Sequence, residues 1–129
     1  MNDLSFPGTS STPAIACSQA DGIVTMRGDS YPENSFELFN PVLDWIEHFL
    51  DTETRSLQFE LHLLYLNTSS VKAMMDIFDL LESAHRKGRE VRVAWYYDSR
   101  NERVAELADE FREDCSFPFE IKVQDAPEA

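Results

Sequence analysis

The stretch LLYLNTSSVKAMMDIFDLL, residues Leu63–Leu81, decides the fold class of this chain. In it an apolar strand pattern runs directly into three hydroxyl residues, Thr68, Ser69 and Ser70, and a strongly apolar helix pattern follows. A helix start gathers four backbone N–H groups that lack partners within the helix, together with the positive end of the helix dipole. A hydroxyl at this junction serves as an ordinary cap, or it carries a phosphate on and off.

The segment that leads into this junction, Leu57–Leu66, alternates between apolar and polar residues in its first part. Such alternation is typical of a strand with one face on the core and the other in contact with water or a partner. The helix after the junction is expected from about Ser69 to Arg86, before a lysine and a glycine. Its apolar residues cover more than one narrow stripe, which favours a deeply packed helix. The alternative is that Met74 or Met75 reaches a partner surface.

The same signals predict the remaining elements on both sides of this unit. Before it lie a hairpin of two strands, Pro13–Cys17 and Ile23–Arg27, and a helix opened by a capping box of Asn34 and Glu37. The buried stripe of that helix is expected to hold Phe36, Phe39, Leu43, Ile46 and Leu50. After it lie a strand with Val91, Val93 and Trp95, a helix opened by a capping box of Ser99 and Glu102, and a strand over Phe119–Val123.

The elements therefore follow the order β-β-α-β-α-β-α-β. Strands separated by single helices favour parallel pairing, and the opening hairpin adds an antiparallel element. We expect a single α/β domain over residues 1–129, with a mixed sheet of about five strands and three main helices. Residues 1–12, rich in Ser, Thr, Pro and Gly, are expected to lie loosely on the surface, and residues 124–129 form an acidic tail.

Composition narrows the class of function. With 24 acidic against 11 basic residues, the net charge of −13 would repel nucleic acid and anionic membranes, and it suits docking onto basic protein surfaces. No apolar run approaches the roughly 20 residues of a membrane span, and the polar start does not resemble a signal peptide. Cys17 and Cys115 each sit in an apolar pattern, which predicts core residues in a reduced, cytoplasmic protein.

Signs of catalysis are weak. His48, His62 and His85 are scattered over different elements without metal-ligand spacing. The chain has no GxSxG motif, no glycine-rich phosphate loop and no nucleophilic cysteine signature. We therefore expect a protein that is not an enzyme and that uses neither a metal nor a cofactor.

Two places could carry a binding or regulatory role. At the first, Asn67 or Thr68 caps the helix in the simpler interpretation, whereas a phosphate on Thr68 would meet the positive helix end and Lys72 one turn further on. The second is Gly28–Asn34, GDSYPEN, which reads either as a turn that feeds the helix cap or as a recognition loop. In the second interpretation the loop presents Asp29, Tyr31 and Glu33 to a partner.

Longer motifs make the chain resemble a known family, the SiaC regulatory phosphoproteins. They are GDSYPENS at Gly28–Ser35, LLYLNTSSVKAMMDIFDLLE at Leu63–Glu82, WYYD followed by NERVAELA at residues 95–108, and CSFPF at Cys115–Phe119. Together these motifs span most of the chain. The resemblance implies a fold similar to the STAS domains of anti-sigma-factor antagonists, which agrees with the element order above.

The resemblance also implies a switch. In this family the threonine of LNTSS, here Thr68, is phosphorylated by a dedicated serine/threonine kinase and dephosphorylated by a PP2C-like phosphatase. The unphosphorylated protein binds and activates a diguanylate cyclase, which raises cyclic-di-GMP and promotes aggregation or biofilm formation. We expect the partner surface to be centred on Thr68, with contacts from Asp29, Tyr31, Asn67, Ser69, Ser70 and Lys72. The alternative is a STAS-like module that binds a small ligand or nucleotide near Thr68.

Overall fold

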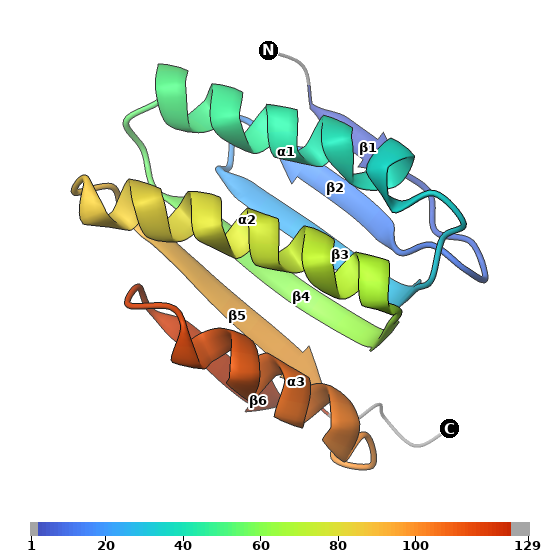
Figure 1. Ribbon diagram of the computed structural model, residues 1–129. Helices are drawn as coiled ribbons and strands as arrows, with labels where there is room; N and C mark the ends of the chain where they lie inside the picture. Colours follow the sequence, from blue (N-terminus) through green and yellow to red (C-terminus); the bar gives the residue numbers. More distant parts are fainter. Residues whose placement is uncertain (1–2, 125–129) are drawn as a thin grey trace.

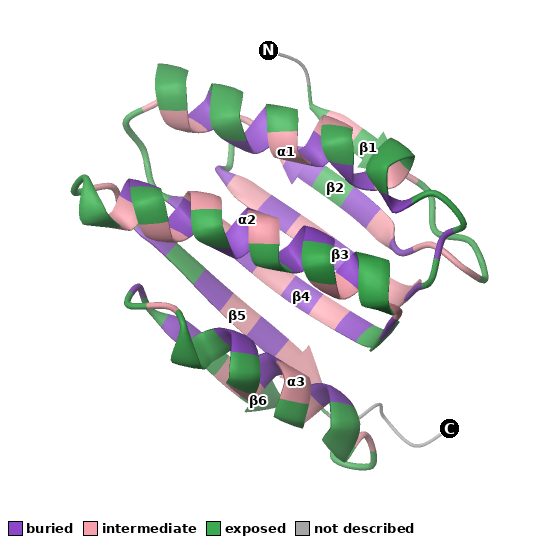
Figure 2. Ribbon diagram, in the orientation of Figure 1, coloured by how far each residue is buried: buried purple, intermediate pink, exposed green. Residues whose placement is uncertain are grey.

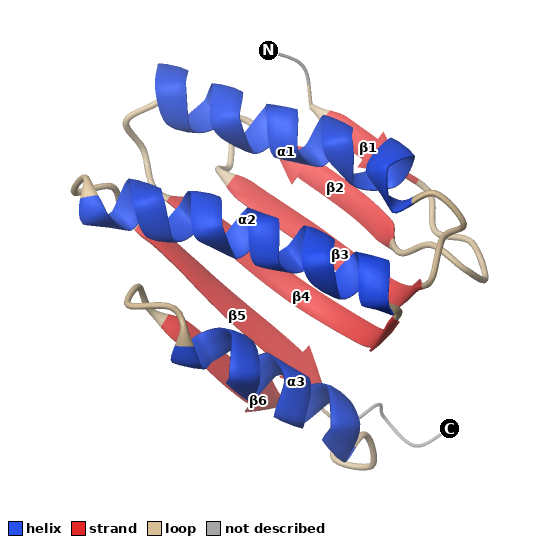
Figure 3. Cartoon of the chain, in the orientation of Figure 1, coloured by secondary structure: helices blue, strands red, loops and turns tan. Residues whose placement is uncertain are grey.

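The computed structural model describes residues 3–124, which form a six-stranded mixed sheet with three helices on one of its faces (Figures 1 and 3). In chain order the elements are β1 (Leu4–Phe6), β2 (Ala14–Ser18), β3 (Ile23–Ser30), α1 (Ser35–Thr52), β4 (Leu57–Leu66), α2 (Thr68–Arg86), β5 (Val91–Tyr97), α3 (Glu102–Glu113) and β6 (Phe119–Val123). Strands lie in the sheet in chain order; β1, β2 and β3 pair antiparallel, and β3 to β6 pair parallel. The predicted α/β class with a mixed sheet is confirmed.

The sixth strand, β1, lies within residues 1–12, where a loose segment was expected, so that expectation is wrong for Leu4–Phe6. Leu4 pairs with Cys17 and Phe6 with Ile15, and the side chains of Leu4 and Phe6 pack against the core. Three residues are too few for an alternating pattern to stand out, and the neighbouring strand β2 supplies the hydrogen bonds that hold them. Of the expected acidic tail, residues 125–129 lie outside the described part of the chain.

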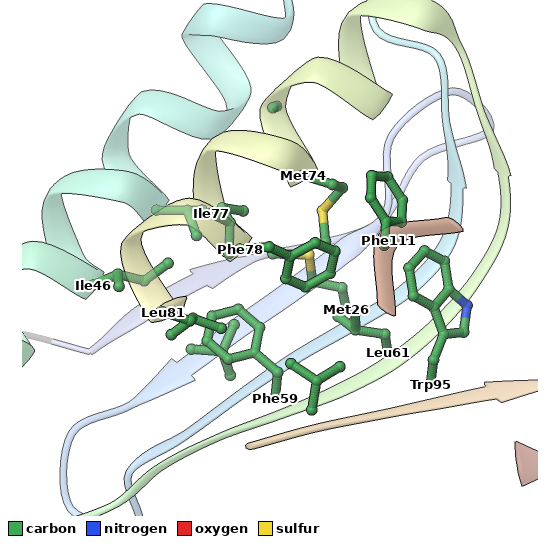
Figure 4. Close-up of a cluster of buried hydrophobic side chains, with 14 of the residues drawn as sticks. Met26, Ile46, Phe59, Leu61, Met74, Ile77, Phe78, Leu81, Trp95 and Phe111 are labelled. Carbon is green, nitrogen blue, oxygen red and sulfur yellow. The ribbon is translucent and has the colours of Figure 1, made fainter. Parts of the chain in front are cut away.

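The core lies between the sheet and its helical layer, and the outer surfaces of the helices are exposed (Figure 2). Alternate residues of β4, from Leu57 to Leu63, are buried, while Gln58, Glu60 and His62 on the opposite face are only partly covered. Figure 4 shows side chains from strands and helices meeting in this core: Met26, Ile46, Phe59, Leu61, Met74, Ile77, Phe78, Leu81, Trp95 and Phe111. The one-sided sheet predicted from the alternation is confirmed.

Asparagines cap all three helices in residues 3–124. The side chains of Asn34 and Asn67 accept from the backbone N–H three residues on; Asn34 was predicted for α1, and Asn67 is one of the two residues, Asn67 or Thr68, considered for α2. The predicted start of α3 is wrong, because its cap is Asn101 and not Ser99. Ser99 lies in a turn that the Asn101 N–H closes onto the Asp98 carbonyl at 2.8 Å, and the helix begins only after it.

The face of α1 that packs against the core differs from the predicted face by about one residue along the helix. Its buried residues are Ser35, Phe39, Val42, Trp45, Ile46 and Phe49, so only Phe39 and Ile46 of the predicted set are fully covered. Phe36 is 68% exposed. Because α1 is apolar over a wide arc, more than one stripe fits its sequence, and packing on the sheet selects among them. None of the helices between residues 3 and 124 is long and apolar enough to cross a membrane.

Candidate functional site

The ends of β3 and β4 lie side by side, which brings the two predicted site segments together. Ser30 pairs with Leu66 in the parallel ladder, and the backbone N–H of Asn67 donates to the Ser30 carbonyl at 2.9 Å. The chain after β3 and the first turn of α2 therefore meet at the carboxyl edge of the sheet, as predicted. One detail differs: β3 continues to Ser30, so only residues 31–34 of the predicted loop connect it to α1.

The three consecutive hydroxyls of α2 have three different environments. The Oγ of Ser70 is buried and lies 2.7 Å from the Oγ of Ser30. The Oγ of Ser69 donates to the Asn67 Oδ1 at 3.2 Å and lies 2.6 Å from the Oγ of Ser35. Thr68 is exposed, and its hydroxyl has no hydrogen-bond partner among residues 3–124. Thr68 and Ser69 are both exposed, but of the three hydroxyls only that of Thr68 lacks a hydrogen-bond partner among residues 3–124.

This arrangement corrects one predicted contact. Ser70 was expected at the partner surface, but its side chain is fully buried and bonded to Ser30. Its backbone N–H also donates to the capping Asn67 side chain at 2.9 Å. Ser70 therefore links the first turn of α2 to the sheet by hydrogen bonds. Because its side chain is buried, a partner cannot contact that side chain directly. Of the two methionines weighed as contacts, Met74 is buried in the core and Met75 is 48% exposed.

A bulge near the end of β4 exposes two apolar residues that precede Thr68 in the chain. Gly28 pairs with Leu63 and Asp29 with Tyr65, so Leu64 is left without a partner in β3. The alternation of β4 breaks here: Leu64 is 50% exposed and Tyr65 55% exposed. The Asn101 side chain donates to the Leu64 carbonyl at 3.0 Å and satisfies the group that the bulge removes from the ladder.

Tyr65 was missed by sequence reasoning, although it contributes to this edge. Its ring lies edge-to-face against that of Tyr31, with 5.9 Å between centroids, and Tyr31 is itself 43% exposed. We call these two residues the tyrosine pair. The available signal was the run of apolar residues that ends β4, which departs from the strict alternation before it.

Exposed apolar side chains gather at this edge of the molecule. In the part of the chain that the structure describes, the large apolar residues that are exposed are Tyr31, Phe36, Leu64, Tyr65, Met75 and Val123. All but Met75 lie at the carboxyl ends of parallel strands or, in the case of Phe36, in the first turn of α1. Of these, Tyr31 and Tyr65 are shown in contact with each other, and an exposed apolar pair of this kind is typical of a protein–protein contact surface.

The charges around Thr68 favour an anion. The first turn of α2 contains no acidic residue, and its N-terminal end carries the positive pole of the helix. Lys72, one turn further on, is largely exposed and forms a long ion pair of 3.9 Å with Asp76. A phosphate on Thr68 would therefore meet a favourable field with a mobile cation within reach.

The two cysteines are unsuited to nucleophilic chemistry. Burial raises the pKa of the Cys17 thiol to about 12, and desolvation with nearby carboxylates raises the pKa of the Cys115 thiol to about 11. A reactive cysteine needs its pKa shifted the other way. Cys17 is a core residue as expected, whereas Cys115 is half-buried and donates to the Phe111 carbonyl at 3.3 Å. Within residues 3–124, no group of three or more His, Cys, Asp or Glu residues is placed to hold a metal ion.

Comparison with known proteins gives consistent matches. A family model described as SiaC family regulatory phosphoprotein matches residues 6–124. A protein of Pseudomonas aeruginosa strain UCBPP-PA14 is 64% identical over 125 residues, which cover 97% of this chain and 99% of the relative.

Solved structures match equally well. The crystal structure of apo-SiaC from Pseudomonas aeruginosa is similar with a TM-score of 0.91 and 63% identity, covering 95% of this chain and 99% of that one. A chain in the crystal structure of the diguanylate cyclase SiaD in complex with its activator SiaC, also from Pseudomonas aeruginosa, is similar with a TM-score of 0.93 and 64% identity. That match covers 95% of this chain and 100% of the other.

Proposed function

This chain belongs to the SiaC family of regulatory phosphoproteins, and from that premise we propose that it is a non-catalytic switch for a diguanylate cyclase. Its unphosphorylated form binds and activates the cyclase, which raises cyclic-di-GMP and promotes aggregation or biofilm formation. A dedicated serine/threonine kinase adds a phosphate to Thr68, and a PP2C-like phosphatase removes it. The proposal is supported by the relative SiaC of Pseudomonas aeruginosa, named as the activator of the cyclase SiaD in their joint crystal structure.

The single observation that carries the phosphorylation step is the free hydroxyl of Thr68. It stands exposed at a helix start between a residue that caps the helix, Asn67, and two serines whose hydroxyls are already engaged. Phosphate added there needs no backbone rearrangement, because the helix dipole favours the charge and the cap remains in place.

The phosphate would act on binding through the surface around it. It adds about −1.5 to −2 charges and three acceptor oxygens next to the exposed edge that holds the tyrosine pair. When a partner covers that edge, the phosphate would lose its water without gaining matched donors, and burying an unpaired charge is very costly. Phosphorylation therefore blocks docking by charge and bulk while the fold stays intact.

The proposed contact surface is centred on Thr68. It includes the predicted residues Asp29, Tyr31, Asn67, Ser69 and Lys72, and Tyr65 joins them as the partner of Tyr31 in the tyrosine pair. Tyr31 and Tyr65 supply apolar area of the kind that protein contacts bury. Asn67 and Ser69 act mainly by holding the first turn of α2, since their side chains bond to each other and to neighbouring groups.

The alternative, a module that binds a small ligand or nucleotide near Thr68, has less support. The hollow nearest to Thr68 has a volume of about 180 Å³, whereas ligand pockets are typically about 300–1,000 Å³. Its lining carries two carboxylates, Glu33 and Asp76, against one lysine, Lys72, so its charge does not select for a nucleotide. The features at this edge fit a protein partner better.

Mass spectrometry of the protein purified from its native host tests the proposed modification. We expect two populations of intact protein that differ by one phosphate, with the modified peptide carrying it on Thr68. Treatment with a PP2C-type phosphatase should merge them into the lighter one. A protein that carries no phosphate under any growth condition, or carries it elsewhere, would overturn the proposed switch.

A further inference from the structure

The N-terminal halves of α1 and α2 enclose a groove beside the Thr68 turn. Its volume is about 180 Å³, and its apolar lining comes mainly from Phe36, Phe39 and Leu43 of α1 and from Ala73 of α2. Ser69 lies at the end of the groove nearest to Thr68. In Figure 1 these two helix starts lie next to each other, at the edge of the sheet where β3 and β4 end. The groove is therefore continuous with the proposed contact surface.

Phe36 is the feature of this groove that the fold does not explain. Its side chain is 68% exposed, the highest value among the large apolar residues that are exposed in residues 3–124. The register of α1 places Ser35 and Phe39 toward the core, so Phe36 is left on the wall of the groove. An exposed phenylalanine next to an apolar hollow is typical of a surface that a partner covers.

The charges on the rim limit what kind of partner fits. Glu33 and Asp76 lie on the lining, and the one cation there, Lys72, is paired only loosely with Asp76. The helix α1 has no lysine or arginine, whereas it carries four carboxylates, those of Glu37, Asp44, Glu47 and Asp51. A partner that brings a positive charge beside its apolar group would complement this rim.

We propose that the groove receives one apolar side chain of the diguanylate cyclase, presented next to a lysine or arginine that faces Glu33 and Asp76. The inference rests on the proposed function, since it assumes that the cyclase is the partner, and it adds the anchor point and its chemistry. A volume of about 180 Å³ suits a single side chain better than a free ligand. Interface energy is commonly concentrated in one or a few such anchored side chains.

An acidic rim that attracts the cyclase does not conflict with a phosphate that repels it. Asp76 follows Thr68 by eight residues, which is about 12 Å along the helix at 1.5 Å per residue. This separation exceeds the screening length of about 8 Å at physiological salt. A phosphate on Thr68 and the carboxylate of Asp76 therefore interact weakly with each other at physiological salt.

Three substitutions test the groove and its rim, with the diguanylate cyclase SiaD of Pseudomonas aeruginosa as the binding probe. Phe36→Ala removes the exposed ring that lines the groove, so it should weaken binding at least tenfold without lowering the melting temperature. Ala73→Leu places a larger side chain in the groove, which leaves less room for the side chain of the cyclase, and should weaken binding similarly. Ala105→Leu, a change of equal size on α3, is the matched control and should bind as the wild type does. Glu33→Lys should weaken binding and reduce its dependence on salt.

The outcomes separate this inference from the proposed function. If Phe36→Ala and Ala73→Leu both bind like the wild type, while phosphate on Thr68 still abolishes binding, the groove is not an anchor point and the switch stands. If the unmodified wild type does not bind the cyclase, the proposed function itself fails. Because Phe36 is exposed, its variant should fold, so the result does not depend on whether Ala73→Leu is tolerated.

Discussion

The hydroxyl oxygens of Ser30 and Ser70 lie 2.7 Å apart in the interior, where they join the last residue of β3 to the first turn of α2. A second pair, between Ser35 and Ser69 at 2.6 Å, joins the same turn to the start of α1. The turn that carries Thr68 is therefore fixed to two other elements. A modification of Thr68 changes the surface of a rigid site, so we expect it to alter binding more than folding.

Thr68→Ala should remove the phosphate altogether without moving it to a neighbour. Ser70 is buried, and the exposed Ser69 would have to give up its hydrogen bonds to Ser35 and Asn67, so we expect neither hydroxyl to replace that of Thr68. Stability should change by no more than about 0.5 kcal/mol, because Thr68 is exposed and the cap is Asn67. Phosphopeptide mapping after incubation with the kinase checks this. Wild-type levels of phosphate on the variant would show that Thr68 is the wrong residue.

The buried serine pair should matter for stability. Ser30→Ala leaves the Ser70 hydroxyl buried without its partner, which should lower the free energy of unfolding by about 1–3 kcal/mol. Ser70→Ala should have a similar effect, and the double variant should lose less than the sum of the two. Chemical denaturation of the four proteins measures this coupling. Additive losses would mean that the two hydroxyls do not interact.

The tyrosine pair should contribute to cyclase binding and little to folding. Tyr31→Ala or Tyr65→Ala removes a ring that is about half exposed, so we expect the affinity for the cyclase to fall at least tenfold, about 1.4 kcal/mol. Glu110→Ala on the outer face of α3 is the control. Titration calorimetry gives the affinities, and circular dichroism confirms folding. A Tyr31→Ala protein that binds normally, beside a defective Glu110→Ala protein, would place the interface on α3.

Glu82 should make stability depend on pH in the acid range. Hydrogen bonds from the Ser116 hydroxyl and backbone N–H, with the Arg86 guanidinium nearby, lower the pKa of the Glu82 carboxyl from 4.5 to about 2. A pKa that is lower in the folded state stabilises the fold above pH 4.5, and this contribution is lost as pH falls toward 2. Glu82→Gln should thus be less stable than the wild type at pH 7, with the gap closing below pH 4.5. A gap that stays constant down to pH 2 would contradict this assignment.

The sequence alone predicted the elements whose signals are local. The alternation of β4, the LNTSS junction and the apolar periodicity of α2 each depend on residues close in the chain, so they predicted the class of fold and the position of Thr68. The expected parallel pairing of strands separated by single helices also holds for β3 and β4, because such crossovers follow general rules.

What the sequence did not predict depends on pairing between distant segments. The strand β1 forms because it can pair with the edge strand β2. Leu64 forms a bulge because, between the pairs Gly28–Leu63 and Asp29–Tyr65, β3 has no residue opposite it. The buried state of Ser70 depends on Ser30, forty residues earlier in the chain. The exposure of Phe36 follows from how α1 packs on the sheet, which its own wide apolar arc does not specify.

Whether phosphate on Thr68 controls cyclase binding is decided by comparing the two forms of the protein. A single preparation is divided into fully phosphorylated and fully dephosphorylated protein, each verified by intact mass. The affinity of both for the diguanylate cyclase and the rate of cyclic-di-GMP formation from GTP are then measured. We predict that the dephosphorylated protein binds and raises the rate, while the phosphorylated protein binds at least tenfold more weakly and leaves the rate at its basal value. Equal affinity and equal activation by the two forms would contradict the account.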